Sequence, residues 1–152
     1  MKWTSKEYIA NHPHKDREGL LTKEDKTPDE IERFWRIIRQ MRYEAGVTIF
    51  DGVHFPDFEM GINPRQDDKE VSEYKIDFWN ENRPLTLEDV VFQNCTFHGI
   101  VNFKKVQFMG DETRFENCTF KKNVNFGAAK FLAKKVIFRR VDFEEARSNA
   151  LI

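Results

Sequence analysis

The sequence FQNCTFHGIVNFKKVQF at residues 92–108 returns as FENCTFKKNVNFGAAKF at residues 115–131, and FRRVDF begins a third copy at residue 138. The copies are offset by 23 residues. A fixed period of this size is typical of a solenoid, in which each repeat stacks on its neighbours. The run from Val90 to Phe143 therefore predicts a repetitive structure.

Within each copy, a small or β-branched residue stands two positions before each Phe. Residues two apart on an extended chain point the same way, so each pair is expected to face inward. From Phe92 the steps between successive Phe residues are 5, 6, 5 and 7, and the same order recurs from Phe115. Four inward pairs per repeat predict a coil with four flat sides, and Phe97, Phe103, Phe120 and Phe126 are expected to be almost wholly buried.

This arrangement resembles the pentapeptide-repeat family, whose unit is a small inward residue, one outward residue, a central Leu or Phe and two corner residues. The resemblance covers Val90–Phe143 and implies an all-β solenoid, a right-handed quadrilateral β-helix. TIFDGVHF at 48–55 fits two earlier units centred on Phe50 and Phe55. The longer steps depart from the family pattern and predict bulged corners, and residues 57–75 interrupt it, so we expect an insertion loop there.

The sequence TPDE at residues 27–30 predicts the start of a helix. Thr27 serves as N-cap, Pro28 takes the first helical position, and Glu30 completes a capping box. Apolar residues follow at helical spacing on one face, namely Ile31, Phe34, Trp35, Ile38, Met41 and Ala45. We expect a helix over 28–45 that caps the first coil.

The chain divides into two regions: an N-terminal arm and capping helix at 1–46, and the β-helix at 47–152. Residues 1–26 are expected to form an irregular arm, with Trp3, Tyr8, Leu20 and Leu21 docked on the body. With 152 residues the chain suits one domain. No stretch reaches the roughly 18 apolar residues that span a bilayer, and the first residues lack the apolar core of a signal peptide, so we expect a cytoplasmic protein.

Only a few polar residues of the sequence are candidates for catalysis, metal binding or a structural hydrogen bond. Cys95 and Cys118 take inward positions and are expected to be buried free thiols, while Asn94 and Asn117 at successive corners predict a side-chain amide ladder. No His or Cys stands at metal-ligand spacing from His54 or His98, and His12 with His14 belongs to a solvated arm. No nucleophile elbow or phosphate loop is present. The sequence predicts no catalytic residue, no cofactor and no metal site, and hence no enzyme.

The net charge of -1 hides a division, because residues 90–152 carry 11 Lys or Arg against 6 Asp or Glu. Pairs of basic residues stand at corners and form a candidate partner surface: Lys121, Lys122, Lys134, Lys135, Arg139 and Arg140. Matched corners carry Gly127-Ala128 and Glu144-Glu145 instead, so we expect no continuous basic stripe.

We therefore expect a non-enzymatic scaffold for protein–protein interaction, with an unidentified protein partner and no membrane partner. One alternative is a DNA-mimicking topoisomerase-interacting protein, as in one branch of the resembled family, although that role needs an acidic rod. Another is nucleic-acid binding through the basic corners, and a third is an enzyme with an unrecognised site. Because the last coil is incomplete, we also expect a homodimer through the C-terminal coil, with Phe143 and Leu151 at the contact.

Overall fold

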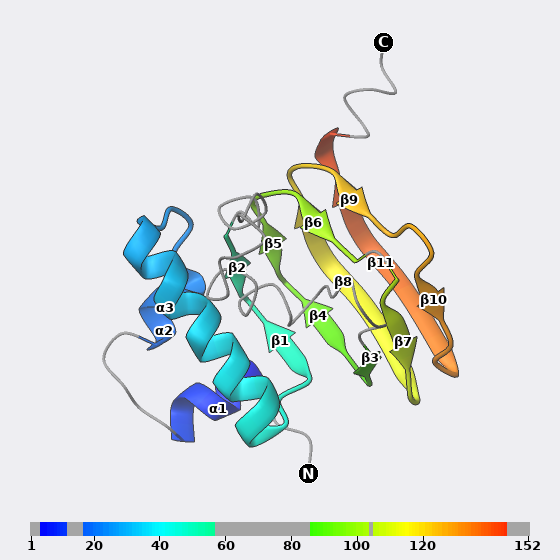
Figure 1. Ribbon diagram of the computed structural model, residues 1–152, viewed down its shortest axis with the longest axis horizontal. Coiled ribbons are helices and arrows are strands. Elements are labelled where there is room, and N and C mark those ends of the chain that lie inside the picture. Colours follow the sequence, from blue (N-terminus) through cyan, green and yellow to red (C-terminus); the bar gives the residue numbers. More distant parts are fainter. Residues whose placement is uncertain (1–3, 12–16, 57–85, 104, 146–152) are drawn as a thin grey trace, which may run out of the picture.

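The structure is a computed structural model that describes residues 4–11, 17–56, 86–103 and 105–145. Its helical part consists of α1 (Ser5–Asn11), α2 (Arg17–Thr22), α3 (Pro28–Arg39) and the π-helical turn η1 (Gln40–Glu44). The strands are β1 (Ile49–Asp51), β2 (His54–Phe55), β3 (Thr86–Glu88), β4 (Val91–Gln93), β5 (Thr96–Phe97), β6 (Val101–Asn102), β7 (Gln107–Met109), β8 (Glu112–Phe120), β9 (Val124–Asn125), β10 (Lys130–Phe131) and β11 (Lys135–Phe143). The helices lie at one end of the stacked strands and β11 at the other (Figure 1).

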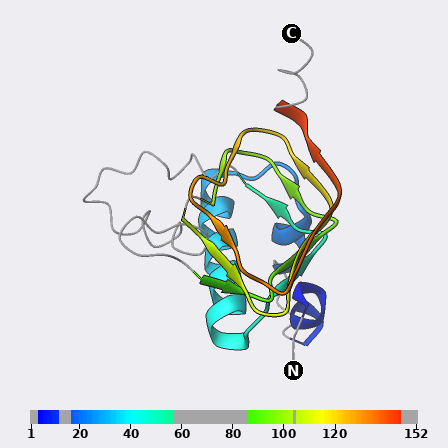
Figure 2. The same cartoon turned by 90° about the vertical axis from the view of Figure 1, so that its right-hand side faces the viewer.

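All the strand pairs of the described residues are parallel. The pairs formed among β4 and the later strands join residues 23 positions apart. β4 pairs with β8, which places Phe92 opposite Phe115, and β8 pairs with β11, which places Phe115 opposite Phe138. Two other sides repeat the offset, β6 with β9 and β7 with β10. We call each such repeat a round. Viewed along the stack, successive rounds surround one common interior (Figure 2).

The interior is built from columns of stacked Phe rings, as the sequence predicts. In one column Phe97 lies between Phe55 and Phe120, with ring centroids 4.7 and 4.4 Å apart and the rings within 7° of parallel. The neighbouring column continues from Phe115 to Phe138 at 5.0 Å. Because rings in adjacent columns meet edge to face, each Phe combines burial with favourable aromatic contacts.

Burial follows position along the stack. Phe97, Phe103 and Phe120 are fully buried, which confirms the expectation for these three. Phe126 is only partly buried, so the expectation for it is wrong. Its ring stacks on Phe103 at 5.3 Å, but among the described residues no further round continues this column beyond Phe126.

The first round begins with β1 and β2, before the insertion, and these strands pair with residues more than 23 positions further along the chain. Phe50 pairs with Phe92 and Phe55 with Phe97, so TIFDGVHF occupies the same two columns one round earlier, as expected. The offset here is 42 residues rather than 23. β3 then returns with Leu87 opposite Phe108. The predicted loop at 57–75 falls outside the described residues.

The N-terminal region is more ordered than the sequence suggests. The capping box of Thr27 and Glu30 forms as predicted, and α3 continues through η1. The expectation of an irregular arm is wrong for α1 and α2, which are short helices. Thr4 and Glu7 form a second capping box at the start of α1. Tertiary packing supplies the stability that such short helices lack alone, because Tyr8, Leu20 and Leu21 are buried as expected. Trp3, also expected to dock, lies outside the described residues.

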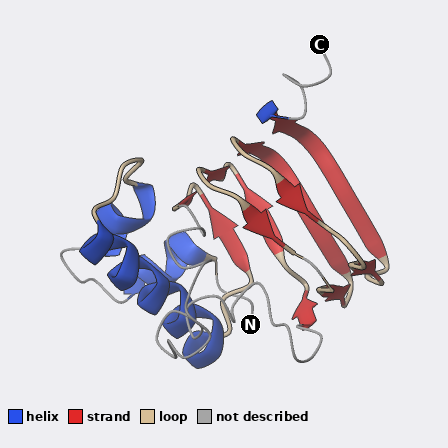
Figure 3. Cartoon of the chain, turned by 45° about the horizontal axis from the view of Figure 1, so that its top comes forward, coloured by secondary structure: helices blue, strands red, loops and turns tan. Residues whose placement is uncertain are grey.

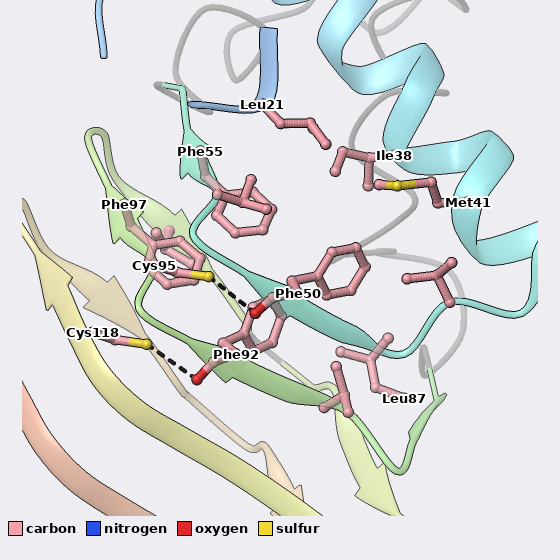
Figure 4. Close-up of a cluster of buried hydrophobic side chains, with 14 of the residues drawn as sticks. Leu21, Ile38, Met41, Phe50, Phe55, Leu87, Phe92, Cys95, Phe97 and Cys118 are labelled. Carbon is pink, nitrogen blue, oxygen red and sulfur yellow. Dashed lines mark hydrogen bonds between the residues drawn. The ribbon is translucent and has the colours of Figure 1, made fainter. Parts of the chain in front are cut away.

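Helix α3 packs its apolar face against the first round. The Phe34 ring lies 5.8 Å from Phe55, edge to face, and Ile38 and Met41 are fully buried above Phe50 (Figure 4). One apolar cluster therefore continues from the helices into the Phe columns. Seen from another direction, α1, α2 and α3 gather at one end of the strands (Figure 3). No helix of the described residues is long and apolar enough to cross a membrane.

Candidate functional site

The end of the stack opposite the helices exposes apolar side chains. Phe138 is 44% exposed although Phe115, the next ring in its column, is fully buried. Phe131, Leu132 and Val136 are exposed beside it. We call these four residues the open end. Contiguous exposed apolar surface of this kind is typical of an interaction site.

Strand β11 forms the edge of the sheet at the open end. It pairs with β8 along residues 135–143, and no other described strand pairs with it. The backbone groups that point away from β8 are thus available to another chain. An apolar face and a strand edge coincide at one place, which is the arrangement that strand addition uses.

The six basic residues of the candidate partner surface are all exposed, as expected. Lys121 and Lys122 follow β8 at one corner, whereas Lys134 precedes β11 and Lys135 begins it at another. Arg139 and Arg140 lie at a third corner, in the middle of β11. They therefore surround the open end without forming one stripe.

Two of these charges already have partners. Arg139 contacts the Glu116 carboxylate at 3.1 Å, and Lys134 lies 3.4 Å from Asp111. Arg140 occupies a corner with positive φ (53°), a region that suits Asn or Gly better than Arg. Some charges of the candidate partner surface are thus paired with nearby carboxylates, whereas the described part of the structure gives no such pair for the others.

The proposed dimer contact is described only in part. Phe143 is partly buried, with its ring stacked on Phe120 at 5.1 Å, and it ends β11. Leu151 lies outside the described residues. The acidic residues Asp142, Glu144 and Glu145 stand beside Phe143, at the opposite end of β11 from Lys135.

A ladder of polar side chains runs along one corner of the stack. The Asn117 amide donates to the Asn94 carbonyl oxygen at 2.6 Å, and the Asn94 amide donates to Asp51 Oδ1 at 3.0 Å. The expected amide ladder is thus confirmed for Asn94 and Asn117. Both have positive φ, and Gly52 and Arg140 continue the same corner above and below them.

A histidine pair was missed by sequence reasoning. His54 Nδ1 lies 2.9 Å from His98 Nε2, and their ring centroids are 5.2 Å apart. The distance between the ring centroids equals the N···N distance plus one ring radius for each histidine, so the two nitrogens lie on the line between the rings. The rings therefore meet edge to edge in a hydrogen bond. Burial lowers the pKa of both imidazoles. The 42-residue offset across the insertion concealed this proximity in the sequence.

The two cysteines are buried free thiols, as predicted. Each thiol donates to a main-chain oxygen of the preceding round, Cys95 to Phe50 at 3.3 Å and Cys118 to Phe92 at 3.2 Å (Figure 4). Burial raises the pKa of the Cys95 thiol. A protonated, enclosed thiol is a poor nucleophile, so Cys95 serves packing.

The described residues contain no group of three or more His, Cys, Asp or Glu side chains that could hold a metal ion. What the geometry defines instead is a parallel repeat structure with one exposed end. Residues 86–130 match the family model described as pentapeptide repeats, with 9 copies. These residues therefore consist of pentapeptide repeats. Neither a curated protein nor a solved structure matches the chain.

Proposed function

We propose that the chain is a non-enzymatic scaffold for protein–protein interaction, built as a right-handed quadrilateral β-helix whose N-terminal end is capped by α1, α2 and α3. The matched repeats and the 23-residue parallel register support this fold. The packing of Phe34 and Trp35 on Phe55 supports the cap. The observation that carries the function is the open end, where Phe138 is 44% exposed in a column otherwise buried.

The occupant of the open end is a second copy of the chain. A two-fold axis through the middle of β11, between Arg139 and Arg140, brings Lys135 of one copy beside Glu144 of the other. Isologous contacts of this kind need a self-complementary surface, and β11 has basic residues at its start and acidic residues at its end. Arg139 is already offset by Glu116, which limits repulsion at the axis. The contact covers Phe138 and Phe143 together.

The basic corners that stay outside this contact receive the protein partner. Lys121 and Lys122 are exposed and belong to the round that precedes β11 rather than to the β11 edge, so we expect them to remain accessible in a dimer. A partner with an acidic segment would be steered to them by charge. The two copies would present two such corners, which raises the effective affinity for a partner with repeated acidic segments.

Charge exchange across the axis tests the dimer. Light scattering behind a sizing column is expected to give twice the chain mass of 18.2 kDa for the unchanged protein. Lys135→Glu and Glu144→Lys should each weaken the dimer, and the double variant should restore it. Glu24→Lys, a charge reversal at an exposed position of the helical end, is the matched control. A monomer at micromolar concentration, or no rescue by the double variant, would exclude the second copy as the occupant.

Capture experiments test the scaffold role. The immobilised protein and its Glu24→Lys control should retain the same partner from native cell extract. The double variant Lys121→Glu with Lys122→Glu should lose that partner. Retention of a topoisomerase, with inhibition of the purified enzyme, would favour the DNA-mimicry alternative. Submicromolar DNA or RNA binding at physiological salt would favour the nucleic-acid alternative instead.

A further inference from the structure

A cavity of about 250 Å³ lies between α1, α2 and the turn that joins β1 to β2. Its apolar wall is made by Ile9, Ala10 and Leu21, and its polar end by Ser5, Lys6 and Asp51. The elements that line it, α1, α2 and β1, lie at the opposite end of the stack from β11 (Figure 1). It is therefore separate from the open end and from the basic corners.

The Asp51 carboxylate is held in place from two sides. Its Oδ1 accepts a hydrogen bond from Asn94 at 3.0 Å, and the main chain that carries it is fixed because the backbone N–H of Asp51 donates to Ser5 Oγ at 2.9 Å. The side chain is 16% exposed. Burial alone would raise the pKa of Asp51, but hydrogen bonds from Asn94 and Gln93 and the Lys6 charge together lower it. The carboxylate is thus a fixed anion at one end of the cavity.

The counter-ion of Asp51 is loosely held. Lys6 Nζ lies 3.5 Å from Oδ2, longer than the roughly 2.7–2.9 Å of a strong charge-assisted hydrogen bond, and the Lys6 side chain is 67% exposed. A flexible lysine in water gains little from such a pair. A ligand ammonium that enters the cavity can therefore displace Lys6 and approach Asp51 more closely.

We propose that this cavity binds a primary ammonium group carried by a short apolar body, with the ammonium on Asp51 and the apolar body against Ile9 and Leu21. The cavity has room for about eight water molecules at their liquid volume, which suits a group the size of a leucine residue. A carboxylate ligand is opposed by the like charge of Asp51. Both a free amine and the N-terminus of a protein with an apolar first residue carry this chemistry.

Titration followed by NMR of backbone amides tests the site with three probes. Leucinamide is expected to shift the amides of Gly52 and Leu21 in a saturable way at millimolar concentration. The neutral analogue 4-methylpentanamide, which lacks the amine, should not. The amide of Leu-Gly-Gly distinguishes the sources: binding equal to leucinamide assigns the site to a protein N-terminus, and weaker binding assigns it to small amines.

Two variants give opposite expectations. Asp51→Asn should weaken leucinamide binding about tenfold or more, since a charge-assisted hydrogen bond is lost. Lys6→Gln should strengthen it, because the competing ammonium is removed, whereas Lys122→Gln far from the cavity should leave it unchanged. Ala10→Trp should fill the cavity and abolish binding if Asp51→Asn proves unstable. Weaker binding in Lys6→Gln, equal binding of the neutral analogue, or no saturable shift would overturn the proposal.

Discussion

The Asn117 side chain gives the sharpest test of the corner ladder, because it performs two separable tasks. Its φ of 53° lies in the left-handed region, and its amide donates to Asn94 at 2.6 Å. Asn117→Ala removes both the tolerance of this φ and the hydrogen bond. Asn117→Gly removes only the hydrogen bond, because glycine adopts positive φ without steric cost.

The magnitudes follow from these two contributions. The left-handed conformation costs an ordinary residue about 1 kcal/mol, and an exposed side-chain hydrogen bond contributes about 0.5–1.5 kcal/mol net. We therefore expect Asn117→Ala to lower the free energy of unfolding by about 2 kcal/mol and Asn117→Gly by about 1 kcal/mol. For a chain of this length, 1 kcal/mol corresponds to a shift in Tm of about 2–4 °C.

Urea unfolding followed by circular dichroism measures both values, provided that the slope with denaturant stays constant. Thr119→Ala, two residues further along β8 at a partly exposed outward position, is the control and should change stability by less than about 0.5 kcal/mol. Equal losses for the Ala and Gly variants would refute the backbone part of the reasoning. No loss for Asn117→Gly would refute the ladder.

Four further outcomes follow from the same structure. Phe120→Ala should cost about 3–5 kcal/mol in urea unfolding, whereas Phe138→Ala, at the 44% exposed end of its column, should cost much less in the monomer; similar losses would contradict the assignment of the open end. Arg140→Asn should raise Tm, because Asn suits the positive φ there and extends the ladder to a further rung. The two thiols should react with a thiol reagent only after unfolding, and rapid labelling of the folded protein would contradict their burial. The folded-state pKa values of His54 and His98 are lowered, so the unfolded state binds more protons than the folded state. The contribution of the pair to stability should therefore be complete above about pH 6.5 and fall as the pH drops through the lowered folded values. His98→Gln should flatten the dependence of stability on pH in that window.

The interior could be predicted from the sequence because every round repeats the same physical requirement. A Phe and its small partner must face inward at each side, so the spacing alone determines which rings stack. The pairing of Phe92 with Phe115, and of Phe115 with Phe138, follows directly from the 23-residue period. The corner ladder of Asn94 and Asn117 follows from the same period, because equivalent corners are stacked one round apart.

Features that involve the first round could not be predicted in this way. The insertion changes the offset to 42 residues, so His54 and His98, or Asp51 and Asn94, have no repeating distance in the sequence. The helices α1 and α2 were missed for a different reason. They are too short to show helical periodicity, and the only local signal was the capping box of Thr4 and Glu7.

The two ends of the stack differ because a periodic sequence determines how rounds pack on each other but contains no information on how the packing stops. At the first round an unrelated sequence supplies the cover, with Phe34, Trp35 and Met41 buried over the rings. In the last described round Phe138 and Val136 retain the repeat pattern but are exposed. They are thus residues of a core type that lie at the surface. One more round of the same pattern would bury them and move the exposed edge along the axis. The number of rounds, rather than any residue within them, therefore decides which side chains of this chain are available for binding.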